Sequence, residues 1–445
     1  MSRLFGTDGI RGVANSELTP ELAFAVGEAL AGLRPSDPDN PFLLGRDTRL
    51  SGPLLEAAFS AGVAAAGGHL LLLGIFTTPG VAIVTWKKQC PGGIAISASH
   101  NPPEFNGIKL LGRDGFKMPD EIEREIEEKV FRGERGPRPT GAQVGFITGD
   151  GGEMAEAYME FLLTSVKGKR LPRRRVCFDC AYGATARFSP MVAAYLGLEA
   201  IVVNGTPEGE RINVDSGSLH PAFLQKVVRE QGAAAGFAFD GDGDRVVAVD
   251  EEGRVLDGDA LLWILARYLH RKGTLSGKAV VGTVMTNMGL ERALGSLGIG
   301  LLRVPVGDRF VASALREKGL SLGGEPAGHI IFLDLAPTGD GLLTALQVLA
   351  VMGEEGVSLS ELASGLELLP QRTVSVPVRH KDGFPGERVE AEIRRAESLL
   401  GDRGRVVVRP SGTEPLIRVT VEGEDEEEVS RLARELASRI EEELS

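Results

Sequence analysis

Runs of apolar residues alternate with amphipathic stretches along most of the chain, in one recurring order. Residues 41–74 read as an apolar strand ending in a polar loop, then a helix, a glycine turn and a second strand. The same order returns at 173–205 and at 277–307. A strand joined through a helix to a parallel strand is the βαβ unit, which builds sheets covered by helices. Three copies therefore predict three similar α/β domains.

After about residue 367 the pattern changes to alternation. The segments 372–378, 405–410 and 415–423 predict strands, and 423–444 predicts a helix with an acidic first turn. The predicted fold class is therefore α/β, with three similar βαβ-type mixed-sheet domains followed by a smaller α+β C-terminal domain. The predicted domain boundaries are 1–150, 151–252, 253–366 and 367–445.

Composition narrows the class of protein. The chain has 445 residues, 42% of them hydrophobic and 25% charged, which is typical of a globular protein with several domains. The net charge of −13 disfavours a nucleic acid or an anionic membrane as partner, because either would require a basic face. The charge run at 121–130 predicts a solvated helix face.

Three cysteines in so long a chain favour a reducing compartment, so we expect a cytoplasmic protein. Residues 1–12 contain no apolar signal region. The most apolar segment, 57–76, is interrupted by two glycines and a histidine. It therefore predicts a buried helix, turn and strand rather than a membrane span.

The segment 236–250 carries the most informative chemistry. Asp240, Asp242 and Asp244 alternate with glycines between two apolar strands, so the backbone can curl until three carboxylates converge. Converging carboxylates repel unless a cation lies among them, and hard oxygen ligands suit Mg²⁺. A calcium EF-hand is an alternative, since Glu251 stands at its twelfth place. Arg245 at the sixth place and the flanking strands disfavour it. A plain acidic turn is the third interpretation.

Two further loops suggest a phosphate and a polyol. In 409–418, Arg409, Ser411 and Thr413 surround Gly412, which fits a concave phosphate site, although a polar β-turn would look similar. In 323–331, Glu325 can accept hydrogen bonds from sugar hydroxyls, and His329 can exchange a proton. This loop follows a βαβ unit, at the edge where such sheets bind ligands.

A fourth loop begins at the end of the apolar stretch 92–96. Ser97 and Ser99 flank Ala98 there, and two prolines stop the strand. Serine, asparagine and proline form turns, so a simple turn is one interpretation. A nucleophile raised into a cleft is the other, and the segment alone does not decide between them.

Taken together, "SASHNP", "DGDGDR", "GGEPAGH" and "RPSGTEP" lie one in each predicted domain. This set, in this order, resembles the α-D-phosphohexomutase family, whose members move a phosphoryl group on a sugar phosphate. The motifs "FGTDGIRG", "VGDRFV" and "RPSGTEPLIRV" resemble the subgroup that acts on glucosamine phosphates.

The resemblance implies roles for particular residues. Ser99 would carry the phosphoryl group, and Ser97 would be a strand-end residue. The same comparison implies one Mg²⁺ held by the phosphoserine and three aspartates, Asp240, Asp242 and Asp244. Residues implied around the transferring group are Arg11, His100, Lys109 and His329. Residues implied to bind the sugar are Arg245, Gly307, Asp308, Arg309, Glu325 and His329. The clamp for the unreactive phosphate would comprise Arg409, Ser411, Gly412, Thr413 and Arg418.

The implied reaction interconverts glucosamine 6-phosphate and glucosamine 1-phosphate through a sugar 1,6-bisphosphate, which supplies amino-sugar nucleotides and cell-wall precursors. Lys109 and His329 are both candidates for the general base. The expected partner is a phosphosugar, with no nucleic acid and no membrane, and the protein is expected to be a monomer or a homodimer. Ala327 replaces a serine of the family's sugar loop, which predicts a shifted sugar preference or weaker binding.

Three other functions stay open. A mannose- or glucose-phosphate mutase of the same family would use the same loops. A non-catalytic, metal-dependent phosphosugar-binding protein would not need a nucleophile such as Ser99. A phosphatase would release free phosphate rather than an isomer.

Overall fold

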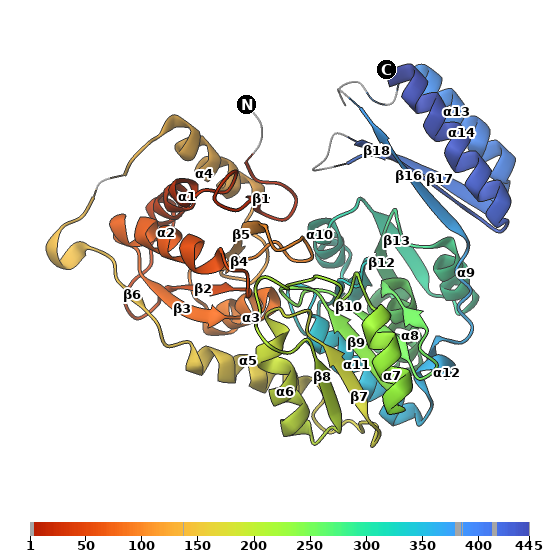
Figure 1. Ribbon diagram of the computed structural model, residues 1–445, viewed down its shortest axis with the longest axis horizontal. Helices are drawn as coiled ribbons and strands as arrows, with labels where there is room; N and C mark the ends of the chain where they lie inside the picture. The colour runs from red at the N-terminus through yellow and green to blue at the C-terminus, as the bar shows by residue number, and fades with distance from the viewer. Residues whose placement is uncertain (1–3, 137, 379–383, 385, 412–415, 445) are drawn as a thin grey trace.

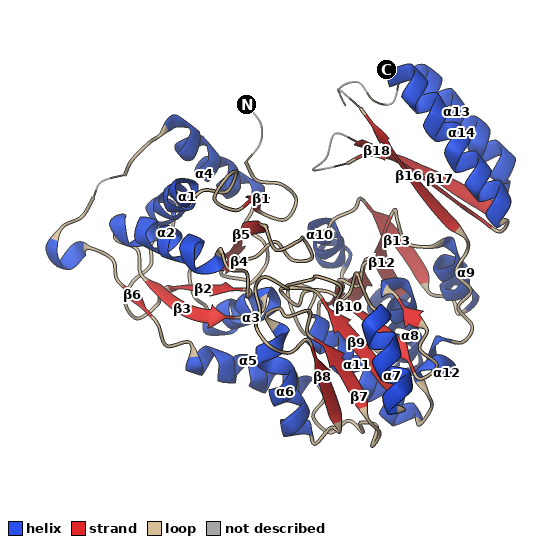
Figure 2. Ribbon diagram, in the orientation of Figure 1, coloured by secondary structure: helices blue, strands red, loops and turns tan. Residues whose placement is uncertain are grey.

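The computed structural model describes residues 4–136, 138–378, 384, 386–411 and 416–444. The described chain forms four sheets, one after another along the sequence, each covered by helices (Figures 1 and 2). We call each sheet with its helices a domain, numbered I to IV in chain order. The predicted fold class is confirmed: three α/β domains precede a smaller antiparallel one.

Domain I contains a six-stranded mixed sheet in the order β1-β5-β4-β2-β3-β6. Its strands are β1 (Ile10–Val13), β2 (Phe42–Arg46), β3 (Leu70–Ile75), β4 (Gly92–Ile96), β5 (Phe105–Gly112) and β6 (Ile147–Thr148). Its helices are α1 (Pro20–Leu33), α2 (Gly52–Ala65), α3 (Thr78–Lys88), α4 (Asp120–Arg132) and the 3₁₀ turn η1 (Gly141–Gln143). The most apolar segment of the sequence forms α2 and β3, as predicted.

Domain II has the strand order β11-β10-β9-β7-β8, and domain III has the order β13-β12-β14-β15. The strands of domain II are β7 (Val176–Asp179), β8 (Ala200–Val203), β9 (Ala235–Phe239), β10 (Val246–Asp250) and β11 (Val255–Leu256). The helices beside them are α5 (Gly152–Ser165), α6 (Thr185–Leu196) and α7 (Ala222–Gln231).

In domain III the strands are β12 (Ala279–Thr283), β13 (Gly300–Val304), β14 (Leu322–Gly324) and β15 (Ile330–Phe332). Its helices are α8 (Gly258–Lys272), η2 (Ser276–Lys278), α9 (Met288–Ser296), α10 (Asp308–Lys318), α11 (Gly341–Glu355) and α12 (Leu359–Ala363).

Each predicted βαβ repeat is confirmed as a parallel pair with its helix. The pairs are β2 with β3, β7 with β8, and β12 with β13. Their helices are α2, α6 and α9. Because the strands run parallel, their carboxyl ends lie at one edge of each sheet, and the loops that leave this edge can meet.

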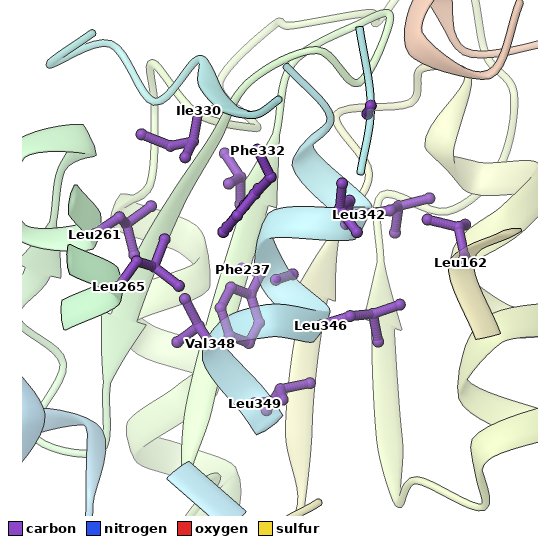
Figure 3. Packing of buried hydrophobic residues seen from close by; sticks show 14 of the residues in the cluster. Leu162, Phe237, Leu261, Leu265, Ile330, Phe332, Leu342, Leu346, Val348 and Leu349 are labelled. Carbon is purple, nitrogen blue, oxygen red and sulfur yellow. The ribbon is translucent and has the colours of Figure 1, made fainter. Parts of the chain in front are cut away.

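One continuous core joins the first three domains. Helix α11 is buried from Gly341 to Gly353, as its nearly unbroken apolar sequence requires. Figure 3 shows this helix packed between elements of domains II and III, with labelled residues Phe237, Leu261, Leu265, Ile330 and Phe332 around it. The same cluster extends to Val81 and Ile83 of α3 in domain I. The loops of these three domains are therefore mounted on one packed body.

Domain IV has a core of its own. Its antiparallel sheet, in the order β16-β18-β17, comprises β16 (Gln371–Pro377), β17 (Gly404–Pro410) and β18 (Leu416–Gly423). Its helices are α13 (Glu387–Leu400), η3 (Gly401–Arg403) and α14 (Glu426–Leu444). The three strands and the last helix were predicted from the sequence, whereas α13 was not. Among the helices that the structure describes, none combines the length and apolar character needed to cross a membrane.

Candidate active site

The loop after β4 brings Ser99 to a buried position at the edge of the domain I sheet. Ser99 has φ of +52°, a left-handed conformation that costs energy for a residue with a Cβ. Its side-chain Oγ donates a hydrogen bond to Asp240 Oδ2 at 2.6 Å and lies 3.2 Å from His100 Nδ1. The serine side chain that sequence reasoning selected therefore faces the acidic loop of domain II.

Arg49 holds this loop in its strained form. Its guanidinium is completely buried and pairs with Asp47 through Nε at 2.9 Å. It donates to four backbone carbonyl oxygens of the loop, those of Ser99, Asn101, Pro102 and Phe105. Asn213 of domain II donates to two of the same oxygens, at 2.9 Å for Ser99 and 3.0 Å for Asn101. Buried hydrogen bonds from two domains thus offset the backbone strain.

Ser97 takes part in the same network. Its hydroxyl donates to Asp47 Oδ2 at 2.6 Å and accepts the Ser99 backbone N–H at 2.9 Å. Ser97 does follow the end of β4, as expected, and it also supports the backbone of Ser99. Sequence reasoning missed the supporting roles of Asp47, Arg49 and Asn213.

The acidic loop between β9 and β10 brings three carboxylates together, as predicted. One oxygen from each of Asp240, Asp242 and Asp244 lies within 4.8 Å of the others, and all three side chains are buried. A Cβ at Gly241 would lie 2.7 Å from the carbonyl oxygen of Ser99, so only glycine lets the two loops approach this closely. The domain I and domain II loops are therefore packed against each other.

The electrostatics of this loop fit a hard divalent cation. Burial and the neighbouring charges of Asp244 and Asp242 raise the pKa of Asp240 well above its ordinary value. In the described structure, Asp242 Oδ1 and Asp244 Oδ1 are buried without a hydrogen-bond donor. A cation among these oxygens would satisfy them and remove the repulsion. The EF-hand alternative does not fit, because Glu251 accepts hydrogen bonds from Ser360 and the loop is flanked by strands.

Basic side chains surround the carboxylates. Lys109 Nζ is 2.9 Å from Asp242, 3.3 Å from Asp244 and 3.1 Å from Asp8. Burial alone would lower the pKa of Lys109, but these carboxylates raise it well above its usual range. Arg11 forms an ion pair with Asp8 and donates to Asn101 Oδ1 at 3.2 Å. Lys109 therefore contacts the acidic loop, and Arg11 contacts the loop that carries Ser99.

His100 and Arg245 complete this group. Burial and the charges of Arg245 and Arg11 lower the pKa of His100 to about 3, so its imidazole is neutral beside Ser99. Arg245 follows the acidic loop, and its backbone N–H donates to Asp240 Oδ1 at 3.1 Å. Its guanidinium Nε lies 3.8 Å from Asp244 Oδ1.

The sugar-binding candidates of domain III meet near this centre. Glu325 Oε1 accepts the backbone N–H of Gly307 at 3.1 Å, so the two predicted sugar loops touch. His329 Nδ1 lies 3.8 Å from Asp244 Oδ1, and Nε2 lies 3.8 Å from Asp308 Oδ2. Burial lowers the pKa of His329, but the carboxylates of Asp244, Asp308 and Glu325 raise it to about 9.

Arg309 pairs with acidic residues that were not among the predicted site residues. Its guanidinium pairs with Asp120 and with both carboxylate oxygens of Glu123, at 3.0 Å each, on α4 of domain I. Glu123 is buried, so the predicted solvated face of α4 is wrong at this position. Arg309 therefore ties domain III to domain I in this structure.

A cleft of about 410 Å³ opens between these groups. Its lining comes from residues 4–11 of domain I, from Asp244 and Arg245 of domain II, and from 306–308, Glu325 and His329 of domain III. A larger groove of about 1040 Å³ lies at the ends of α5 and α6 and contains no predicted site residue. The small cleft is where loops of three domains and the buried charges coincide.

The fourth loop is described in part. Arg409 on β17 and Arg418 on β18 are register partners, and Ser411 follows the end of β17. Gly412 and Thr413 lie outside the described residues. Burial and the charge of Arg418 lower the pKa of Arg409, whereas Glu325 raises it.

Models of known families match the chain in four consecutive stretches. Their descriptions are phosphoglucomutase/phosphomannomutase alpha/beta/alpha domains I, II and III and the C-terminal domain of the same enzymes. The matched residues are, in that order, 2–136, 156–253, 257–368 and 374–439. The order of the matches is the order of the four sheets.

Relatives of full length agree with these models. A phosphoglucosamine mutase from Symbiobacterium thermophilum is 48% identical over 100% of both chains. Another from Thermoanaerobacter pseudethanolicus is 45% identical, again over 100% of both chains. A solved structure of a phosphoglucomutase/phosphomannomutase family protein from Burkholderia thailandensis is similar in fold. Its TM-score is 0.82 at 24% identity, over 99% of this chain and 98% of that one. The resemblance seen in the four loops is thereby confirmed, and the chain belongs to the phosphoglucomutase/phosphomannomutase family.

Proposed function

We propose that this protein is a mutase that interconverts glucosamine 6-phosphate and glucosamine 1-phosphate through a phosphorylated Ser99. The observation that carries the proposal is the 2.6 Å contact between Ser99 Oγ and Asp240 inside the buried carboxylate cluster. The choice of sugar is supported by the name phosphoglucosamine mutase that the full-length relatives bear.

We further propose Mg²⁺ as the cation, held by Asp240, Asp242, Asp244 and the phosphorylated Ser99. Three carboxylates on one short loop, two of them with buried oxygens that accept no hydrogen bond in the described structure, form an oxygen donor set that suits it. When bound, Mg²⁺ supplies charge stabilisation for a phosphoryl group in transfer.

The side chains of the protein position the reacting groups. Arg49 and Asn213 fix the backbone of Ser99, so its oxygen keeps one place and direction. Lys109 adds positive charge beside the carboxylates, and neutral His100 borders the serine oxygen. Fixed charges of this kind stabilise a transferring phosphoryl group without reorganisation during the reaction.

The substrate would bridge the cleft from domain IV to Ser99. Its unreactive phosphate would bind the clamp of Arg409, Ser411, Gly412, Thr413 and Arg418, and its hydroxyls would face Glu325. Transfer from phosphoserine to the free hydroxyl gives a 1,6-bisphosphate. The intermediate then turns and returns its other phosphoryl group to Ser99. For the hydroxyl proton, Lys109 and His329 both stay candidates: His329 lines the cleft, and three carboxylates engage Lys109.

We also propose a cellular compartment and an oligomeric state for the protein. All three cysteines are free and buried, which supports a reducing compartment such as the cytoplasm. A monomer or a homodimer stays the prediction for the assembly.

A substrate panel tests the proposed function. Purified protein with Mg²⁺ and a trace of sugar 1,6-bisphosphate is incubated with glucosamine, glucose or mannose 6-phosphate, and both 1-phosphates and free phosphate are measured. We expect glucosamine 1-phosphate to form fastest. A clear preference for glucose or mannose would overturn the substrate assignment and leave a mutase. Accumulating phosphate would indicate a phosphatase, and binding without turnover would indicate a binding protein.

A further inference from the structure

Six side chains from three domains form a closed ring beside the cleft, in which carboxylates alternate with basic groups. In order around the ring they are Asp244, Lys109, Asp8, Lys117, Asp308 and His329. Asp8 and Lys117 have no role in the proposed function. They nevertheless form one of the two paths of the ring between Asp244 and Asp308, and His329 forms the other.

Lys117 bridges two domains. A tight turn after β5 places it opposite Leu111, with the Met118 N–H donating to Leu110 O at 2.9 Å. Its Nζ pairs with Asp8 and donates to Thr7 O at 3.3 Å, both in domain I. The same nitrogen lies 2.5 Å from Asp308 Oδ1 at the start of α10 in domain III. The bridge is therefore short and largely withdrawn from solvent.

This bridge orients the two oxygens of Asp308 differently. Oδ1 accepts hydrogen bonds from Lys117 and from the backbone N–H of Arg309, at 2.5 and 2.9 Å. Oδ2 accepts no hydrogen bond within the described part of the chain, and His329 Nε2 lies 3.8 Å from it. That nitrogen itself accepts the Gly339 N–H at 3.1 Å. Oδ2 is thus an open acceptor on a residue that lines the cleft.

The other carboxylates of the cleft have other partners or other proposed roles. Asp8 contacts three cationic groups, Lys109, Lys117 and Arg11. Asp244 belongs to the proposed metal loop. Glu325 accepts a backbone N–H from Gly307 and is assigned to the sugar hydroxyls in the proposed function. Asp308 Oδ2 is therefore a further acceptor for a donor from a sugar.

An amino sugar differs from a neutral sugar by presenting an ammonium group where the other presents a hydroxyl. A carboxylate oxygen forms a charge-assisted hydrogen bond with an ammonium, which is stronger than its bond to a hydroxyl. We propose that Asp308 recognises the ammonium group of the amino sugar, and that Lys117 is the positioning residue that keeps Asp308 Oδ2 directed into the cleft. This inference rests on the proposed function and names the group that selects its substrate.

The test compares substrates in matched variants. The readout is the ratio of kcat/KM for glucosamine 6-phosphate to that for glucose 6-phosphate, with the inhibition constant of glucose 6-phosphate replacing its kcat/KM if turnover is too slow. Asp308→Asn keeps the shape of the side chain and removes its charge. We expect this variant to lower the ratio roughly 10- to 100-fold, as for one hydrogen bond to a charged group. Exposed Asp334, changed to Asn, is the control.

Lys117 is tested in the same way. Lys117→Met should raise KM for both sugars and lower the ratio of kcat/KM for glucosamine 6-phosphate to that for glucose 6-phosphate. Lys117→Arg should lower this ratio less, because it keeps the charge. Lys318→Met, on the exposed end of α10, controls for loss of a lysine. Thermal unfolding of each variant separates positioning from misfolding, and Asp308→Asn decides the case if Lys117→Met does not fold.

An unchanged ratio of kcat/KM in Asp308→Asn would overturn the inference, whether the variant keeps both values of kcat/KM or loses them equally for both sugars. A parent protein that prefers glucose phosphate would refute the proposed function. The change of ratio between parent and variant would still decide whether Asp308 contacts the ammonium, so the two failures are distinguishable.

Discussion

The Ser99 side of the cleft and the clamp of domain IV are built in opposite ways. Around Ser99, loops of domains I and II interlock through Arg49 and Asn213, above a core that domains I to III share. Domain IV has a separate core and is joined to domain III by local contacts. The Arg405 guanidinium, for example, donates to carbonyl oxygens of Val284 and Thr286, at 2.9 and 2.5 Å. The proposed transfer site thus stands on a core that three domains share, whereas the proposed phosphate clamp belongs to a domain with its own core, an arrangement that suits a hinged domain.

The strongest test of this contrast between the Ser99 region and domain IV is substitution of Ser99 and Ser97. Ser99→Ala should lose several orders of magnitude in turnover, because phosphate monoesters react very slowly without a covalent route. Mass spectrometry of the parent protein should find phosphate on Ser99. Phosphate on residue 97 with an active Ser99→Ala would contradict the assignment.

Ser97→Ala is the matched comparison within the same loop. It removes the acceptor of the Ser99 N–H and a donor to buried Asp47. We expect a measurable loss of turnover, much smaller than the loss in Ser99→Ala, together with a lower melting temperature. Unchanged turnover and stability would show that the loop does not depend on this support.

Removing one carboxylate tests the proposed metal. Asp242→Ala should remove most activity and weaken Mg²⁺ binding measured by calorimetry, because one ligand is lost while the flanking strands keep the fold. Asp242 also pairs with Lys109 and accepts a hydrogen bond from Thr78, so thermal unfolding must accompany the assay. Normal turnover with parental Mg²⁺ affinity would refute the metal site.

In domain IV, Arg409→Met should act mainly on binding. Loss of a guanidinium from a phosphate clamp removes a charge-assisted contact present throughout the reaction, so KM should rise roughly 10-fold or more with a smaller change in kcat. Exposed Arg395, changed to Met in the same domain, is the control. A fall in kcat alone would place Arg409 in the transfer step and blur the contrast between the two regions.

The smallest expected effect is at the sugar loop. Ala327→Ser adds the hydroxyl that the resemblance to the family implies at this place, and one neutral hydrogen bond is worth about 0.5–1.5 kcal/mol. We expect KM for glucosamine 6-phosphate to fall about two- to tenfold by steady-state kinetics. No change would mean that residue 327 does not reach the sugar.

The sequence allowed the fold to be predicted because apolar periodicity and glycine turns act locally. Helix α13 was missed although its signal was present, with apolar residues at 389, 393, 396 and 400. The burial of Glu123, which lies within a charge run, could not be predicted for a different reason. A run describes an average face, whereas the ion pair with Arg309 depends on one position.

The candidate loops could also be found from sequence, because their residue types and glycines indicate their chemistry. Their supports could not. Arg49, Asn213 and Lys117 lie far along the chain from Ser99 or Asp308, and each is an ordinary polar residue until folding brings it beside its partner. A role that depends on tertiary contacts leaves no local pattern.

The double hold on the Ser99 carbonyl oxygen has a consequence for the size of molecule that can react. Arg49 from domain I and Asn213 from domain II both donate to this oxygen, so the backbone of Ser99 has one position. In the proposed reaction, the end of the substrate that reacts must therefore reach that position, and domain IV is the part left to adjust to the length of the substrate. The spacing of the two phosphoryl-bearing oxygens then matters through the reach of domain IV, separately from any contact with the ring.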